Sequence, residues 1–387
     1  MTERHDRLRS QADNKIKLWA SGKMDLTFLA LVLILLGIGL VMLFSASYAY
    51  AHTLYGNSYK FISRQAIFAL GGVAGMLFVS RLNYRVLRPL AWVIYGVAVV
   101  LLIVVLLLPP LREGFNYKRW IVIGSLNFQP SEIAKFAIVL LFSYLISKNQ
   151  HKMEKFTYGV LWLGFLLLVV CSLIVVETHL SATILILSIG VMLMIVGGIK
   201  RVFIVAGGLG VVGLGALAIV TGLVSYGSSR IQYWIDPWAA PTGEGYQTIQ
   251  SLLSIGSGGL LGKGLGQSRQ KYLWVPEPHN DFIFSIVCEE LGLIGAIVII
   301  ILFALLVWRG FVIAMRCPDK FGSLMVLGLT FQVGIQTALN MMVVTNTIPN
   351  TGISLPFFSY GGTALVILLL EMGVILSISR SCKMEKS

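Results

Sequence analysis

The residue best suited to catalysis is Asp281, an acid within the run Pro276-Glu-Pro-His-Asn-Asp-Phe-Ile-Phe284. Apolar neighbours such as Phe282 and Trp274 would partly desolvate this carboxylate, raise its pKa and suit it to act as a general base. A carboxylate at the start of an apolar run also suits a second role, in which it favours the positive N-terminus of a helix. His279 either orients this acid or is an ordinary loop histidine.

A second polar pair lies in the run Gln129-Pro-Ser-Glu-Ile-Ala-Lys135, whose proline favours a helix start. Glu132 and Lys135 are three residues apart, so they share one face of that helix. The pair is either a plain stabilising ion pair or, with Asp281, part of a polar cluster that opens to the outer leaflet. Arg119, just before this run, adds another cation on the same side.

Two features flank Asp281, and each has a structural and a functional interpretation. The acids Glu289 and Glu290 would lie roughly 12 Å deeper along a helix, where they either bond to neighbouring helices or form a proton or ion path. The glycine-rich segment 256–266 lacks the phosphate-loop spacing, because Lys263 is followed by glycine where Ser or Thr is needed. That segment is either a flexible turn or a backbone cradle for a lipid-linked phosphate.

These residues belong to a chain of 387 residues that is 57% apolar and 12% charged, with a mean hydropathy of +0.84. Soluble domains are nearer 45–50% apolar and about 25% charged, so the composition excludes a soluble globular enzyme and a disordered protein. The net charge is +13, but the basic residues are scattered between apolar runs, which excludes a nucleic-acid-binding patch. The four cysteines match no zinc-site spacing.

The apolar runs predict an all-α polytopic membrane protein with ten transmembrane helices, because each run can cross a hydrocarbon core of roughly 30 Å. The expected helices span residues 24–46, 62–80, 86–108, 131–147, 157–176, 181–199, 202–223, 282–308, 321–344 and 356–379. They form one membrane domain, 24–380, between an N-terminal segment, 1–23, and a tail, 381–387. A long loop, 224–281, separates the seventh and eighth helices and contains an amphipathic stretch at 246–255.

The distribution of Lys and Arg predicts the orientation of the chain. Alternate loops hold 20 of these cations on one side, which includes both termini, and nine on the other. The positive-inside rule therefore places the N- and C-termini in the cytoplasm and the long loop outside. The sequence Ala49-Tyr-Ala51 resembles a signal-peptidase site, but the apolar run from Phe28 to Phe44 is too long for a cleaved signal, so we expect a retained helix.

Four motifs, in this order, resemble the SEDS family (shape, elongation, division and sporulation) of bacterial membrane proteins. They are Gln129-Pro-Ser-Glu-Ile-Ala-Lys135, Gly245-Tyr-Gln-Thr-Ile-Gln-Ser251, Pro276-Glu-Pro-His-Asn-Asp-Phe-Ile-Phe284 with Glu289-Glu-Leu-Gly292, and Pro356-Phe-Phe-Ser-Tyr-Gly-Gly362. The likeness covers roughly residues 24–380 and is closer to the FtsW and SpoVE branch than to RodA. Two positions depart from the family pattern: the segment 176–182 reads Val-Glu-Thr-His-Leu-Ser-Ala where many members have Gln-Pro-Asp-Leu-Gly-Thr, and Asn280 stands where Thr is common.

The resemblance implies a peptidoglycan glycosyltransferase that polymerises lipid II into glycan strands on the outer face of the cytoplasmic membrane, for septal synthesis in cell division. A sugar hydroxyl would attack an anomeric carbon while undecaprenyl pyrophosphate leaves, which needs a general base and cations. Asp281 matches the family's catalytic aspartate, and Glu132 with Lys135 match its paired cavity residues. The other expected substrate-binding residues are Arg119, Lys263, Arg269, Lys271 and His279. Metal ligands stay unassigned, although a pyrophosphate suits a divalent ion such as Mg²⁺ or Mn²⁺.

The resemblance also implies partners and a location. The expected partners are lipid II, a class B penicillin-binding protein that cross-links the strands, and other divisome membrane proteins. The expected location is the bacterial cytoplasmic membrane, crossed many times, with enrichment at the septum. A small-residue surface on the eighth and ninth helices would receive the partner's helix; its residues are Gly292, Gly295, Gly328 and Gly334.

Alternative functions stay open at this point. Within the family, the chain would instead be a RodA-like elongation polymerase or a SpoVE-like sporulation polymerase. From another class, a lipid II flippase would use the inward acids Glu289, Glu290 and Glu371 as part of a polar path through the bilayer. A non-catalytic scaffold for a transpeptidase is the third alternative. The position of the motifs at outer helix ends favours the polymerase.

Overall fold

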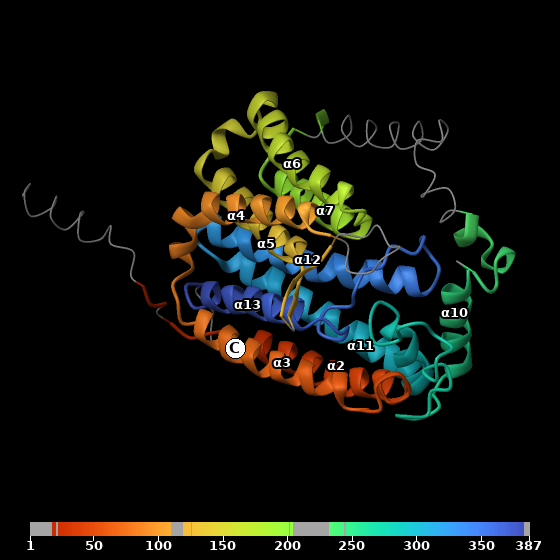
Figure 1. Cartoon of the computed structure of the whole chain (residues 1–387). Coiled ribbons are helices and arrows are strands. Elements are labelled where there is room, and N and C mark those ends of the chain that lie inside the picture. Colours follow the sequence, from red (N-terminus) through yellow and green to blue (C-terminus); the bar gives the residue numbers. More distant parts are fainter. Residues whose placement is uncertain are drawn as a thin grey trace, which may run out of the picture.

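The computed structural model describes residues 18–20, 22–109, 119–124, 126–200, 202–203, 232–243 and 245–382. These residues form an all-α polytopic membrane protein, as the sequence predicts (Figure 1). The main helices are α2 Leu26–Tyr55, α3 Lys60–Val79, α4 Leu87–Leu107, α5 Pro130–Lys148, α6 Leu163–Val176, α7 Leu180–Val196, α10 Tyr246–Gly258, α11 Ile283–Arg316, α12 Lys320–Val344 and α13 Gly362–Ser379. A π-helical segment, Phe156–Trp162, leads into α6, and short 3₁₀ turns occupy Tyr84–Val86, Gln150–Lys152 and Pro237–Ala239.

Eight helices among the described residues are long and apolar enough to cross a membrane, and α7 is a shorter apolar helix. The expected span 202–223 lies, except for its first two residues, outside the described residues, as do 1–17 and 383–387. The count of ten spans, the cytoplasmic termini and the division of the chain at 23 and 380 therefore stay predictions.

Helix α5 lies at the centre of the bundle and packs against α4, α7 and α12 (Figure 1). Its most apolar stretch is 72% buried by the protein itself, more than that of any other spanning helix described. Small side chains such as Ala134 and Ala137 alternate there with Ile138 and Leu141, all fully buried, so neighbouring helices approach on every side. This position places both ends of α5 in contact with several other helices.

Helix α13 begins at Gly362, six residues later than the expected start at 356, because residues 355–361 form a turn instead of a helix. Phe357 in this turn has a φ of 65°, a left-handed conformation that a helix does not allow. The side chain of Gln65 on α3 fixes the turn, accepting from Gly361 N at 3.2 Å and donating to Ser359 O at 3.3 Å. The turn therefore stays packed against the start of α13.

Helix α11 is interrupted at Gly292, where φ is 69° and ψ is −171°. The loop 259–264 fills the interruption: its Lys263 and Gly264 amides donate to the carbonyls of Glu289 and Glu290 at 2.9 and 3.0 Å. Leu293 N donates in return to Gly259 O at 2.9 Å. The glycine-rich segment therefore contains a turn, as one interpretation expected, but the backbone of this turn is bonded to α11. The amides of Lys263 and Gly264 are already used, so they offer no donors to a phosphate.

Three of the four glycines expected to receive a partner helix are covered by this chain instead. A Cβ on Gly328 would meet Val139 of α5, and one on Gly334 would meet Val307 of α11. Gly292 faces the loop described above. Gly295 is partly exposed, and a Cβ there would meet only Leu291 of its own helix, so the four glycines do not form one free surface.

Candidate active site

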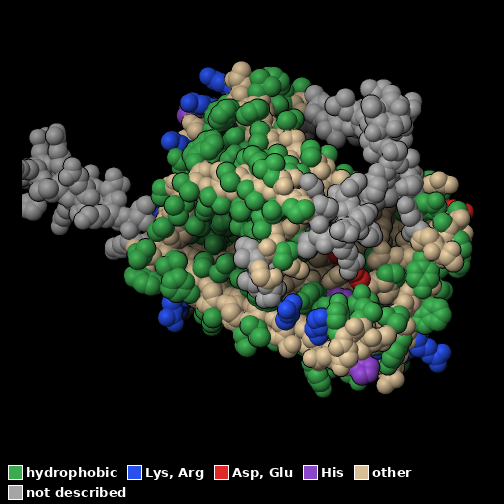
Figure 2. Space-filling view, viewed as in Figure 1, with side chains coloured by type: hydrophobic (Ala, Val, Ile, Leu, Met, Phe, Trp, Pro, Cys, Tyr) green, Lys and Arg blue, Asp and Glu red, His purple; other side chains and the backbone are tan. Residues whose placement is uncertain are grey.

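A cavity of about 630 Å³ opens at the end of the bundle where α3, α5, α7, α11 and α13 begin and α12 ends. We call this the cavity end. Figure 2 shows acidic and histidine side chains in a hollow of an otherwise largely apolar face, with Lys and Arg side chains beside it. Seven acidic, basic or histidine residues line the cavity: Arg64, Arg119, Glu132, Lys135, His179, Glu277 and Asp281.

Asp281 lies two residues before α11, and its carboxyl faces this cavity. Burial raises the pKa of Asp281 to about 6; the charge of Glu277 adds to the increase, and Arg119 opposes it. Phe282 beside it is buried, as expected, whereas Trp274 is exposed. A carboxylate in this state accepts a proton near neutral pH more readily than an ordinary aspartate.

The side chains of Glu132 and Lys135 form an ion pair of 2.9 Å on the first turns of α5, which confirms the shared helix face. Helix α5 begins at Pro130, as the sequence indicates. Lys135 is only 3% exposed and also donates to Gln336 Oε1 of α12 at 3.1 Å. The cation is thus held at the cavity wall by two partners on different helices.

Arg119 and His179 also line the cavity wall near Lys135. Arg119 Nη2 donates to the carbonyl of Thr178, which connects the segment before the β1–β2 hairpin (Ile121–Ile123 and Leu126–Phe128, antiparallel) to the start of α7. Burial lowers the pKa of His179 to about 3, with Arg119 and Lys135 acting in the same direction, so this imidazole is neutral. Burial likewise raises the pKa of Glu177 to about 8, against the effect of Arg119.

His179 is a cavity residue that the sequence reasoning missed. It lies in the segment 176–182, whose departure from the family pattern was the available signal. Arg64 and Gln336 were also missed, because a helix pattern alone does not show which polar side chain reaches a cavity. Arg64 lines the mouth from α3, and Gln336 supports Lys135.

His279 does not line the cavity. It is 3% exposed, and its ring packs among those of Phe61, Tyr50 and Tyr360, with ring centroids 4.2, 5.0 and 5.9 Å away. Burial lowers the pKa of His279 to about 4, so the ring is neutral. Its position is that of a packing residue that anchors the segment before α11.

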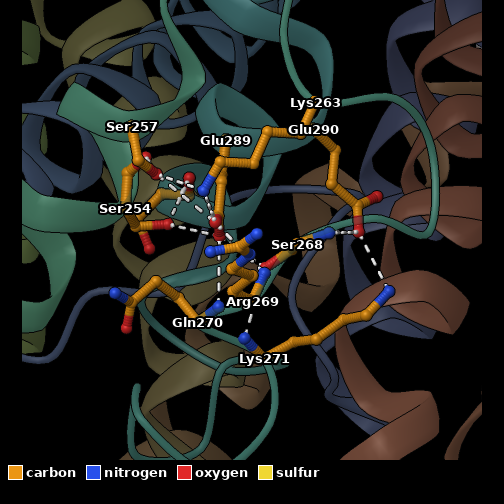
Figure 3. Close-up of polar contacts among 10 residues, drawn as sticks. Ser254, Ser257, Lys263, Ser268, Arg269, Gln270, Lys271, Glu289 and Glu290 are labelled. Carbon is orange, nitrogen blue, oxygen red and sulfur yellow. Dashed lines mark hydrogen bonds and ion pairs between the residues drawn. The ribbon is translucent and has the colours of Figure 1, made fainter.

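Three other expected substrate-binding residues also lie outside the cavity lining: Lys263, Arg269 and Lys271. Figure 3 shows them beside Glu289 and Glu290 instead. Lys263 pairs with Glu289 at 2.6 Å, and Lys271 pairs with Glu290 at 3.1 Å. The main-chain amide of Arg269 donates to Glu289 at 3.1 Å. These residues hold the loop against α11, so their charges are not directed at the cavity.

The adjacent acids of α11, Glu289 and Glu290, are bonded to neighbouring segments. This agrees with the structural interpretation of these acids and not with a proton or ion path. Glu289 accepts from Ser254, Ser257 and Ser268 as well as from the loop amides (Figure 3). Glu290 accepts from Ser45 of α2 at 2.7 Å and from the amide of Ser268 at 3.3 Å. Both carboxylates are almost fully buried and join α2, α10 and the loop to the first half of α11.

No group of three or more His, Cys, Asp or Glu residues able to hold a metal ion occurs among the described residues. In the cavity, Glu132 is already paired with Lys135, which leaves Asp281 and Glu277 as the acids near each other. The described lining residues therefore contain no cluster of three such ligands around Asp281.

Comparison with known proteins identifies the family. Residues 25–384 match the family model described as "Cell cycle protein", which covers FtsW, RodA and SpoVE. The chain belongs to this family. It is 37% identical over 357 residues to the Stage V sporulation protein E of Bacillus subtilis (strain 168), covering 92% of this chain and 97% of that protein. It is 35% identical over 374 residues to a probable peptidoglycan glycosyltransferase FtsW of Geobacter metallireducens, covering 95% and 98%.

Solved structures of family members share the fold. A chain described under "Structural coordination of polymerization and crosslinking by a peptidoglycan synthase complex" matches with a TM-score of 0.73 and 28% identity, covering 92% of this chain and 98% of that chain. The rod shape determining protein RodA of Thermus thermophilus matches with a TM-score of 0.67 and 27% identity, covering 94% and 98%. These matches confirm the resemblance to the SEDS family, and the sequence identity to the SpoVE and FtsW relatives exceeds that to this RodA.

Proposed function

We propose that this protein is a peptidoglycan glycosyltransferase that polymerises lipid II on the outer face of the bacterial cytoplasmic membrane, in septal synthesis. The FtsW relatives carry the name of this activity over nearly the whole chain length. The observation that carries the site assignment is that one cavity contains an acid of raised pKa, Asp281, together with Lys135 and Arg119. A base and cations in one enclosed space are what glycosyl transfer to a hydroxyl with a pyrophosphate leaving group requires.

In the proposed reaction, Asp281 takes the proton of an attacking sugar hydroxyl. The hydroxyl oxygen forms the new glycosidic bond to the anomeric carbon as the bond from that carbon to the pyrophosphate oxygen breaks. The electron pair leaves with undecaprenyl pyrophosphate, which needs no proton of its own. Lys135 and Arg119 stabilise the charge that develops there, because fixed cations in a cavity are more effective than the same charges in water.

The contacts of the buried acids favour the polymerase over a flippase. A flippase needs polar groups that can face a moving headgroup across the full bilayer thickness. Glu289 and Glu290 are instead occupied by the loop, and Glu371 accepts from Gln332 at 2.8 Å. A scaffold has no need of an acid of raised pKa in a cavity lined by cations.

The proposed partner is a class B penicillin-binding protein, in a complex with other divisome membrane proteins at the septum. The family member with a TM-score of 0.73 is described as part of a complex that coordinates polymerization and crosslinking. The described residues contain no group of three or more His, Cys, Asp or Glu that could hold a metal ion, and a requirement for Mg²⁺ or Mn²⁺ is a separate proposal. Turnover in a chelator, followed by addition of either ion, tests it.

The decisive experiment uses the purified full-length protein, alone and with candidate class B penicillin-binding proteins, incubated with lipid II and followed by glycan-chain analysis. Wild type should form glycan strands. Asp281→Asn should reduce their formation by about 10²–10⁴-fold while folding persists, the range typical of a lost general base. Near-normal synthesis by this variant at matched amounts would remove Asp281 from the base role.

A further inference from the structure

The main chain at and just before Asp281 is fixed by two side chains and one main-chain amide that the reaction scheme does not use. Three consecutive carbonyls, those of His279, Asn280 and Asp281, each accept a hydrogen bond from a different donor. Tyr360 N donates to the first at 2.8 Å and Ser359 Oγ to the second at 2.8 Å. Asn340 Nδ2 of α12 donates to the third at 2.7 Å. The segment that leads into α11 is thus held by hydrogen bonds at three successive carbonyls.

Asn340 makes a second hydrogen bond besides the one to Asp281. The same Nδ2 donates to Ile353 O at 2.6 Å, so one amide group bridges the acid and the segment after α12. Asn340 is fully buried, and Ile353 is 2% exposed. A bond in such a water-poor place is strong, and a carbonyl left without its donor there is costly.

The bridged segment forms the wall against the carboxyl group. Gly352 precedes Ile353 and has a φ of 72°; a Cβ on Gly352 would lie 3.2 Å from Asp281 Oδ2. Its amide donates to Asn350 Oδ1 at 3.1 Å, and its carbonyl accepts from Ser181 of α7 at 3.4 Å. The wall is therefore held from two sides, and Asn340 sets its distance from the acid.

We infer that Asn340 is a positioning residue for Asp281: its amide holds the acid's main chain against the wall at Gly352, and so fixes where the carboxylate meets the attacking hydroxyl. The inference rests on the proposed role of Asp281. Asn340 does not line the cavity, so it acts through the acid and not on the substrate. Small displacements of a catalytic group slow the reaction strongly, since a misplacement of about 1 Å can reduce the rate about 10²-fold.

The test compares Asn340→Leu, which has a similar volume and no donor, with Asn340→Ser, which leaves room for water to bond both carbonyls. Asn149→Leu is the matched control, because Asn149 is also hydrogen-bonded but lies at the opposite end of α5. All variants are purified full length, and the folded fraction is measured by size-exclusion chromatography and thermal unfolding. Rates are measured against lipid II concentration and pH.

We expect both Asn340 variants to lose about 10- to 100-fold in kcat, with KM for lipid II within about threefold of wild type, because binding groups stay in place. In Asn340→Ser, the acidic limb of the pH profile should also move below its wild-type midpoint, since water admitted beside Asp281 lowers the pKa of this carboxyl. Asn149→Leu should keep the wild-type kcat and profile per folded molecule.

Two outcomes separate this inference from the function on which it rests. If Asp281→Asn is inactive but the Asn340 variants keep the wild-type kcat per folded molecule, the positioning role is refuted and the base assignment stands. If Asp281→Asn is active, the base assignment itself fails. A loss in the Asn340 variants that follows only their folded fraction, with an unchanged pH profile, would mean a structural role and would also overturn the inference.

Discussion

Gly292 of α11 and Gly262 of the preceding loop are in direct main-chain contact: a Cβ on Gly292 would lie 2.3 Å from the nitrogen of Gly262. Both residues have positive φ values, 69° and 79°. Any other residue would be strained in that backbone conformation and would collide with backbone that cannot give way. This contact fixes the loop at the level of the buried acids Glu289 and Glu290.

Gly292→Ala and Gly262→Ala should therefore destabilise the protein, each by about 1–3 kcal/mol or more, the usual cost of a strained backbone position. The measurements are the thermal unfolding midpoint and limited proteolysis in the loop 259–271, where cleavage should increase. Gly256→Ala is the control, because this glycine is helical and a Cβ on it would meet nothing within 4 Å. Equal destabilisation by all three substitutions would contradict the proposal that the Gly292–Gly262 contact holds the loop in place.

The free energy of unfolding should depend strongly on both partners of the Lys271–Glu290 ion pair. Each side chain is at most 3% exposed, so Lys271→Met or Glu290→Gln leaves the other group buried without its partner. We expect a loss of about 3–5 kcal/mol for each single change, and less than the sum for the double variant. Arg88→Met is the comparison: its pair with Asp319 is partly exposed and should contribute about 0–1 kcal/mol. Additive losses at 271 and 290 would mean that the two groups do not interact.

The polymerisation rate should rise with pH through about 6, because Asp281 must be deprotonated to accept a proton and burial raises its pKa to about 6. A rate that is independent of pH between 5 and 7, under conditions in which chemistry limits turnover, would contradict this assignment.

The same raised pKa predicts an effect on stability with a defined sign. A carboxyl whose pKa is higher in the folded state than in the unfolded chain costs stability when it is charged. This cost is absent below the ordinary aspartate pKa of 3.8, grows as the pH rises to about 6, and is complete above it. Asp281→Asn should therefore unfold at a higher temperature than wild type at pH 7 and at a similar one below pH 4. A lower unfolding temperature at pH 7 would be the contrary result.

Lys135→Met should reduce polymerisation by about 10²–10³-fold, the loss typical of removing one group that stabilises developing charge. Lys148→Met is the matched control, since Lys148 is exposed at the other end of the same helix. The measurement is glycan formation from lipid II at equal amounts of folded protein. If both variants keep the wild-type rate, Lys135 serves only to pair with Glu132.

The sequence predicted most of the helices and the Glu132–Lys135 pair because both depend on local spacing. An apolar run of about 20 residues and an i, i+3 pair on one helix leave few alternatives. The position of the loop cations was not predictable in this way. Lys263 and Lys271 carry the same charge as Lys135, and only the path of the chain from α10 to α11 decides that they meet Glu289 and Glu290.

The positions of His179 and Asn340 were likewise not predictable from local spacing in the sequence. His179 stands at a loop end, where no periodicity indicates a direction, and its place in the cavity follows from how α7 packs. Asn340 reads as one polar residue in an apolar helix, and its contact with Asp281 joins residues 59 positions apart. Contacts of that separation are set by tertiary packing, which a single sequence does not display.

The break in α11 also bears on how the chain enters a bilayer during synthesis. As one continuous helix, its 34 residues would be about 51 Å long, much longer than a hydrocarbon core of roughly 30 Å. The part after Gly292 is about 36 Å long by the same rise and suffices for insertion by the translocon without its acidic beginning. We therefore expect Glu289 and Glu290 to lose their water only when the loop docks on them. Asp281, the proposed base, lies two residues before that short first half, so we expect it to reach its final position only after that docking.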